Sequence, residues 1–235
     1  MSIGENIRRI RLEIREAAAA AGRDPEEILL LAATKTNDAA RVREAIAAGV
    51  DICGENRVQE MLEKQQQGAY EGCPLHFIGH LQKNKVKQVA GRAALIHGAD
   101  SEELLLLISR CAQKQGLVQD VLLEVNIGGE ASKSGFRPEE IPAALHFASE
   151  LSALRVRGLM AIPPICASGE ENRPYFARMQ QLFVDNGKKK YDNVTMDFLS
   201  MGMSGDYREA IGYGANILRL GSAIFGMRIY NHESA

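Results

Sequence analysis

Stretches of two kinds alternate along the whole chain, and this alternation limits its fold more than any single motif does. Short runs rich in leucine and β-branched residues predict strands, and amphipathic stretches of about ten to twenty residues predict helices. The eight predicted strands span residues 28–34, 51–54, 75–79, 94–97, 121–127, 156–162, 195–201 and 217–220. The predicted helices span residues 2–21, 38–48, 58–67, 84–90, 102–115, 139–151, 173–186 and 206–212. This pattern is typical of the α/β class with a parallel sheet.

The length of the chain favours one closed barrel. Eight strand–helix units in 235 residues match a (β/α)8 barrel of the TIM type, for which about 250 residues are typical. The helix predicted at 2–21 precedes the first strand and is an extra N-terminal helix. The pattern alone leaves a doubly wound parallel sheet open. Because no linker, repeat or low-complexity segment interrupts the alternation, we expect residues 1–235 to form a single domain.

Composition excludes several classes of protein. Lysine and arginine number 28 against 30 aspartate and glutamate residues, so the basic excess of a phosphate-backbone binder is missing and we expect no nucleic-acid partner. The longest apolar runs, 28–33 and 104–108, are much shorter than the ~18 residues of a bilayer-spanning helix. The N-terminus has glutamates among its isoleucines and fits no targeting signal. We therefore expect a cytoplasmic protein without membrane segments.

Lys35 lies where the first predicted strand ends, and the active sites of parallel barrels form at the carboxyl ends of their strands. Side chains alternate along a strand, so Lys35 shares a face with Leu31 and Ala33. If that face is inward, the amine is desolvated in the barrel mouth, which favours the neutral form that attacks an aldehyde. The segment alone leaves open a lysine that extends into solvent from the strand end.

Two turns of small residues follow the last two predicted strands and suit a phosphate group. Residues 200–206 form the first turn, with Ser204 where the next helix is expected to begin. Gly221 and Ser222 form the second turn, at the start of a short helix whose N–H groups can face an anion. Barrels of this type frequently bind phosphate after strands seven and eight. We therefore predict one phosphate site that both turns share.

Arg219 lies on the last predicted strand, on the face opposite to Leu218 and Leu220. If the leucines pack under the outer helices, the guanidinium group of Arg219 points into the barrel. A fixed cation there needs a partner, either a structural carboxylate such as Glu124 or an acceptor atom of a ligand. The residues alone favour the structural ion pair.

His76 and His80 share a strand face and are candidates for a base or a metal site. A histidine at a strand end is more often a structural hydrogen-bond partner, and no third metal ligand accompanies the pair, so we predict neither role.

The four cysteines lie far apart without a CxxC pair and are interpreted as reduced packing residues. Lys83, Lys85 and Lys87 form a charged helix face, with a weak anion or partner patch as the alternative.

Seven segments, spread over nearly the whole chain, carry a family resemblance. They are ATKT at 33–36, GENR at 54–57, HFIGHLQKNK at 76–85, SKSGF at 132–136, GLM at 158–160, LSMGMS at 199–204 and RLGSAIFG at 219–226. In this order they resemble the pyridoxal phosphate homeostasis protein family. The fold of that family is similar to the N-terminal barrel domain of alanine racemase, so the resemblance implies the same (β/α)8 barrel.

The resemblance also implies the cofactor pyridoxal 5'-phosphate (PLP) and the residues around it. Lys35 is implied to form an internal aldimine with PLP, and Arg219 is implied to face the pyridine nitrogen. The residues implied to bind the phosphate group are Ser204, Gly221 and Ser222, and those implied to wall the pocket are Asn56 and Met201. A permanent cation at Arg219 opposes protonation of the pyridine nitrogen, so the ring is a weaker electron sink.

By resemblance, the chain is expected to be a non-catalytic carrier or regulator that keeps the cellular level of PLP in balance, without turnover of an amino acid. Racemases of this barrel type take a second base from an additional β-domain, and we expect no such domain after Gly226, nine residues before the last. A monomer is therefore expected, with PLP-dependent apoenzymes as candidate recipients of PLP. The alternatives are a PLP-dependent racemase-like enzyme and a Schiff-base aldolase that uses Lys35 directly; only the aldolase would be colourless.

Overall fold

Eight parallel strands form one closed barrel in the computed structural model, which describes residues 2–166, 168–188 and 190–226. The strands are β1 Leu29–Ala33, β2 Ile52–Glu55, β3 Leu75–Phe77, β4 Leu95–Ala99, β5 Gln119–Val125, β6 Leu154–Ala161, β7 Val194–Ser200 and β8 Ile217–Leu220. Each strand pairs with the next, and β8 pairs in parallel with β1. The predicted barrel is confirmed, because a doubly wound sheet would leave two edge strands unpaired.

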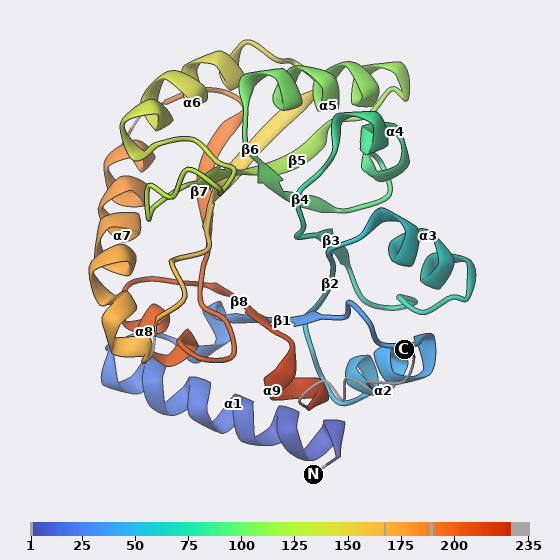
Figure 1. Ribbon diagram of the computed structural model, residues 1–235, viewed down its shortest axis with the longest axis vertical. Helices are drawn as coiled ribbons and strands as arrows, with labels where there is room; N and C mark the ends of the chain where they lie inside the picture. The colour runs from blue at the N-terminus through green and yellow to red at the C-terminus, as the bar shows by residue number, and fades with distance from the viewer. Residues whose placement is uncertain (1, 167, 189, 227–235) are drawn as a thin grey trace, which may run out of the picture.

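Helices surround the barrel on its outside, as Figure 1 shows. They are α1 Ile3–Ala20, α2 Ala39–Ala47, α3 Val58–Gln66, α4 Val86–Val89, α5 Glu102–Lys114, α6 Ile141–Ser149, α7 Arg173–Gly187, α8 Tyr207–Gly212 and α9 Ser222–Phe225. Short 3-10 turns lie at Pro25–Glu27, Lys83–Lys85, Pro138–Glu140 and Gly169–Asn172. None of these helices is long and apolar enough to cross a membrane.

Two predicted helices begin differently in the structure. The helix predicted at 84–90 is a 3-10 turn, Lys83–Lys85, followed by the single turn of α4. The helix predicted at 139–151 begins with the 3-10 turn Pro138–Glu140, and α6 starts only at Ile141. Pro142 explains the second difference, because proline has no N–H group to donate and is tolerated only in the first turn of an α-helix.

The predicted extra helix α1 is confirmed. It packs against α8 and α9, and α9 begins in the predicted phosphate turn. Ser2 and Glu5 form the predicted capping box at its start. Its isoleucines are buried, and the helix runs along α8 and α9 (Figure 1). The Asn6 amide donates to the Ile224 carbonyl in α9 at 2.9 Å, and the Tyr207 hydroxyl in α8 donates to Glu13. These contacts fix the position of α9 relative to the barrel.

Two apolar clusters divide the core between the inside and the outside of the barrel. The smaller, inner cluster contains Leu31, Ala33, Ile52, Ile78, Leu95, Leu122, Met160 and Ile217. The larger cluster lies between the strands and the helices and includes Leu30, Ala32, Leu218 and Leu220. The predicted alternation therefore holds in β1 and β8, with Leu31 and Ala33 facing inward and the leucines around Arg219 facing outward. All four cysteines are free.

Candidate functional site

Lys35 and the turn after β8 lie side by side at the carboxyl end of the barrel. Parallel pairing of β1 with β8 sets Leu31 opposite Arg219 and Ala32 opposite Leu220, so the segments that leave these two strands are neighbours. A Cβ atom added to Gly221 would lie 3.6 Å from the Cβ of Ala33. Lys35, two residues beyond Ala33, is half-buried. The lysine and the predicted phosphate turn are thus brought together.

The two predicted phosphate turns are joined through Ser204. Its hydroxyl oxygen accepts a hydrogen bond from the Ala223 N–H in α9 at 3.2 Å, and its hydroxyl hydrogen is left to donate to an acceptor. The expectation that Ser204 lies where the next helix begins is wrong: α8 starts at Tyr207, after Asp206. The Asp206 side chain accepts from the Met203 N–H at 2.7 Å and closes the loop that precedes this helix.

Arg219 points into the barrel and is held by neutral groups. Its Nη1 donates to the Ser200 hydroxyl oxygen at 2.5 Å, and its Nη2 donates to the Ala161 carbonyl at 2.9 Å. The residue is only 5% exposed, and burial lowers its pKa to about 10, so it stays protonated at neutral pH. The structural ion pair with Glu124 is not formed: among the described residues, no carboxylate lies within ion-pair distance of Arg219.

Two buried histidines extend this contact across the barrel interior. The Ser200 hydroxyl oxygen lies 3.0 Å from Nδ1 of His97, and Nε2 of His97 lies 3.0 Å from Nδ1 of His76. The Ser200 hydroxyl, which accepts from Arg219, can either donate to or accept from this ring nitrogen, according to the tautomer of His97. Sequence analysis missed His97 and Ser200 as partners, although both share the inward face of their strands with Leu95 and Phe198.

Both histidines in this chain of hydrogen bonds are neutral. Burial lowers the pKa of His76 to about 4. The pKa of His97 is also lowered, first by complete burial and then by the electrostatic effect of the adjacent His76 ring and of the Arg219 cation. Within the described ranges, no group of three or more His, Cys, Asp or Glu side chains could hold a metal ion. The chain of hydrogen bonds from His76 through His97 and Ser200 ends on the Arg219 guanidinium group.

Asn56 and Met201, the two predicted wall residues, have different surroundings. The side-chain oxygen Oδ1 of Asn56 is buried and has no hydrogen-bond partner among the described residues. A buried acceptor without a donor is costly, so Asn56 is suited to receive a donor from a ligand. Met201 is fully buried in the outer apolar cluster. Its side chain therefore packs in the apolar layer between the strands and the helices.

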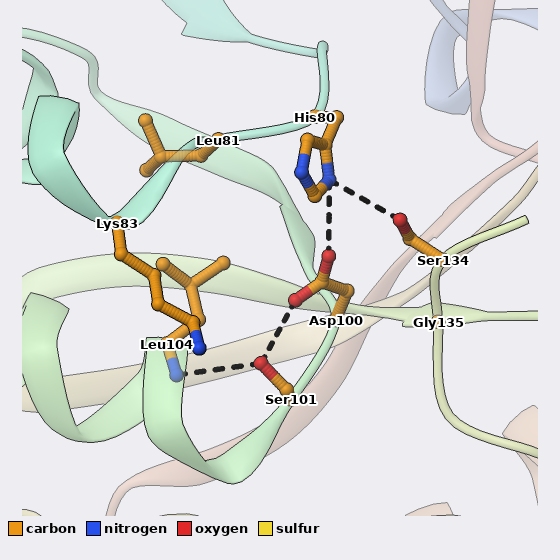
Figure 2. A pocket seen from close by; sticks show the side chains of 8 residues that line it. All are labelled: His80, Leu81, Lys83, Asp100, Ser101, Leu104, Ser134 and Gly135. Atoms are coloured by element: carbon orange, nitrogen blue, oxygen red, sulfur yellow. Dashed lines mark hydrogen bonds and ion pairs between the residues drawn. The ribbon is translucent and has the colours of Figure 1, made fainter.

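His80 lines a separate pocket on the rim, and Figure 2 shows its contacts. The pocket holds about 300 Å³ and is lined by residues that follow β3, β4 and β5. Nδ1 of His80 lies 3.1 Å from an Asp100 carboxylate oxygen and 3.2 Å from the Ser134 hydroxyl oxygen. A Ser–His–Asp relay needs the serine and the aspartate on different ring nitrogens, and here one nitrogen faces both. His80 thus ties two loops together, as the structural interpretation predicts.

The barrel, the lysine after its first strand and the turns after its last two define a protein of the alanine racemase class. Residues 6–229 match the family described as "Alanine racemase, N-terminal domain". A relative from Pseudomonas aeruginosa is 45% identical over 230 residues, which are 97% of this chain and 97% of the relative. A relative from Aquifex aeolicus is 42% identical over 230 residues, 98% of this chain and 100% of the relative. Both carry the name pyridoxal phosphate homeostasis protein, and the chain belongs to this family.

Solved structures show the same fold. PipY of Synechococcus elongatus PCC7942, determined with PLP bound, has a TM-score of 0.82 and 30% sequence identity; the match covers 96% of this chain and 100% of PipY. Alanine racemase of Clostridium difficile 630 has a TM-score of 0.69 and 16% identity. That match covers 97% of this chain and 58% of the racemase. At this identity the racemase shows a shared fold only.

Proposed function

We propose that this chain binds PLP covalently through Nζ of Lys35 and takes part in intracellular PLP homeostasis without turning over an amino acid. The observation that carries the proposal is the joining of the two phosphate turns by Ser204 and Ala223 beside the end of β1. The segment that carries Lys35 and the two turns that suit a phosphate group are neighbours at one end of the barrel. The relatives' shared name and the PLP in PipY support this choice of ligand.

The residues present fit PLP at both of its ends. N–H groups in the first turn of a helix have no intrahelical acceptor, so the turn at Gly221 and Ser222 offers backbone donors to a phosphate group. The Ser204 hydroxyl adds a side-chain donor, because its oxygen already accepts from Ala223. On the ring side, Asn56 offers a buried oxygen without a partner. Arg219 supplies the cation that would face the pyridine nitrogen.

The charge of Arg219 supports holding PLP rather than amino-acid turnover. Bound PLP supplies an aldehyde for a lysine amine and a ring that can withdraw electrons from a substrate. A cation beside the pyridine nitrogen opposes its protonation, which weakens this withdrawal. With a pKa of about 10, Arg219 remains charged throughout the physiological range. Ser200 and Ala161 also fix its two terminal nitrogens, so it cannot turn away without breaking buried hydrogen bonds.

The covalent attachment is tested by the visible absorbance of the protein mixed with PLP. Borohydride reduction followed by peptide mapping should place the label on Lys35, and Lys35→Ala should lose both the absorbance and the label. Lys85→Ala is the matched control, because Lys85 is also half-buried and should keep both. Labelling of another lysine, with unchanged absorbance in Lys35→Ala, would reject Lys35. A colourless protein that reacts with a sugar phosphate instead would favour the aldolase alternative.

The absence of turnover is tested by deuterium exchange at Cα of alanine, serine and other amino acids in the presence of the PLP-loaded protein. Exchange no faster than in Lys35→Ala supports a holding role, whereas rapid exchange would favour the racemase-like alternative.

The proposal also includes a cytoplasmic, monomeric protein that passes PLP to PLP-dependent apoenzymes. Sedimentation of the pure protein tests the monomer, and recovery of activity in a PLP-free apoenzyme tests the transfer.

A further inference from the structure

We propose that Glu60, with the buried cluster of Glu55 and Lys64, positions Lys35 by holding the turn that carries it in a strained conformation. This inference rests on the proposed function, since it concerns how Lys35 is presented to PLP. None of the three positioning residues is proposed to touch the cofactor. Each acts through the backbone on either side of Lys35.

The turn itself contains an unusual backbone angle. The Asn37 N–H donates to the Thr34 carbonyl at 3.1 Å, which closes a four-residue turn with Lys35 and Thr36 at its centre. Thr36 has a φ of 63° and is the only described non-glycine residue with a positive φ. Glycine or asparagine is usual at such a position, and a β-branched residue there is a genuine outlier. The strain lies immediately after the lysine.

A carboxylate on the neighbouring helix holds the strained residue. Glu60 of α3 accepts a hydrogen bond from the Thr36 N–H at 2.7 Å. Glu60 also lies 3.5 Å from the ammonium group of Lys64 and 3.4 Å from Arg57. The Thr36 hydroxyl donates to the Lys35 carbonyl at 2.6 Å. Both the N–H and the side chain of Thr36 are therefore engaged in the conformation that the residue alone would avoid.

A buried ion pair holds the other side of the turn. Lys64 Nζ lies 2.6 Å from Glu55 Oε1 and donates to the Thr34 carbonyl at 2.8 Å. The same Glu55 oxygen accepts from the Thr34 hydroxyl at 2.5 Å and from the Tyr70 hydroxyl at 3.0 Å. Glu55 is fully buried and Lys64 is 7% exposed. Thr34 therefore has both its carbonyl and its side chain fixed by the second strand and the helix that follows it.

Together, these contacts restrict the backbone conformation of Lys35 from both sides. Thr34 is held by the ion pair, Thr36 is held by Glu60, and the Lys35 carbonyl accepts from the Thr36 hydroxyl and the Asn37 amide. Sparsely populated backbone conformations persist only when the surroundings impose them, and they concentrate at functional sites. A lysine whose backbone is fixed loses less freedom when its amine bonds to an aldehyde. The expected effect is faster capture of PLP.

The experiment removes the bond to Thr36 and measures both the turn and the capture. Glu60→Ala deletes the acceptor, Glu60→Gln keeps an acceptor oxygen in its place, and Glu63→Ala is the matched control on the exposed side of α3. Hydrogen exchange of the Thr36 amide, without PLP, reports the turn. The rate at which borohydride traps PLP on Lys35 reports the capture, and thermal unfolding of each variant reports the fold.

Glu60→Ala should lose the exchange protection of Thr36 and capture PLP more slowly by about tenfold or more. Glu60→Gln and Glu63→Ala should match the wild type. If Glu60→Ala loses the exchange protection of the Thr36 amide but captures PLP at the wild-type rate, the inference is overturned. It is also overturned if the Thr36 amide exchanges without protection in the wild type. If the wild type traps no PLP, the proposed function fails instead.

Discussion

Mild acid is expected to destabilise this barrel, because two neutral histidines lie in its interior. Burial lowers the pKa of His76 to about 4 and that of His97 well below its usual range. In the unfolded chain both rings are solvated and have an ordinary pKa of about 6.5. The unfolded chain therefore binds more protons than the folded one. Stability is complete above about pH 6.5 and falls as the pH drops from there toward about 4.

The size of the loss follows from these pKa values. Between about pH 7.5 and about pH 5, His76 lowers the free energy of unfolding by about 2 kcal/mol, and His97 adds to the loss in the same direction. That is a large part of the roughly 5–15 kcal/mol of a typical domain. Glu124 opposes part of the loss, because burial and the nearby Asp100 raise its pKa and the folded protein binds its proton more readily.

Urea unfolding without added PLP, at the two pH values, measures this loss. In His76→Gln, the side-chain amide can either accept from or donate to Nε2 of His97. This variant should lose about 2 kcal/mol less than the wild type between the two pH values, and the contribution of Glu124 cancels in the comparison. His146→Gln, which removes an exposed ring, should lose as much as the wild type. Equal losses in all three proteins would refute the neutral, buried state of His76.

Two further predictions concern the proposed PLP site. Ser204→Ala combined with Ser222→Ala should weaken PLP retention by about 1–3 kcal/mol for each hydrogen bond lost to the phosphate group. Equilibrium dialysis measures this, and unchanged retention would place the phosphate elsewhere. Arg219→Gln should shift the visible absorbance of bound PLP, because a neutral amide replaces the cation near the ring. A spectrum identical to that of the wild type would show that Arg219 does not face the ring.

The architecture was predictable from the sequence, and so was the placement of the end of β1 beside the turn at Gly221. The alternation of strand and helix patterns predicted eight strands, and the ends of seven differ from the structure by only one or two residues. Face alternation predicted that Leu31 and Ala33 point inward. Because the carboxyl ends of parallel strands meet at one end of a barrel, the order of the strands was enough to bring Lys35 near the turn at Gly221.

The partners of the buried polar groups were decided only by the tertiary structure. Arg219 donates to Ser200 and Ala161 instead of forming the expected ion pair with Glu124. The pairing of Ser200 with Ile217 places Ser200 next to Arg219, and this depends on strand register. Likewise, Lys64 binds Thr34, thirty residues away along the chain. Hydrophobic periodicity specifies which face of an element is buried. A hydrogen bond, however, needs its donor and acceptor atoms within about 3 Å of each other, and only the closed barrel determines these interatomic distances.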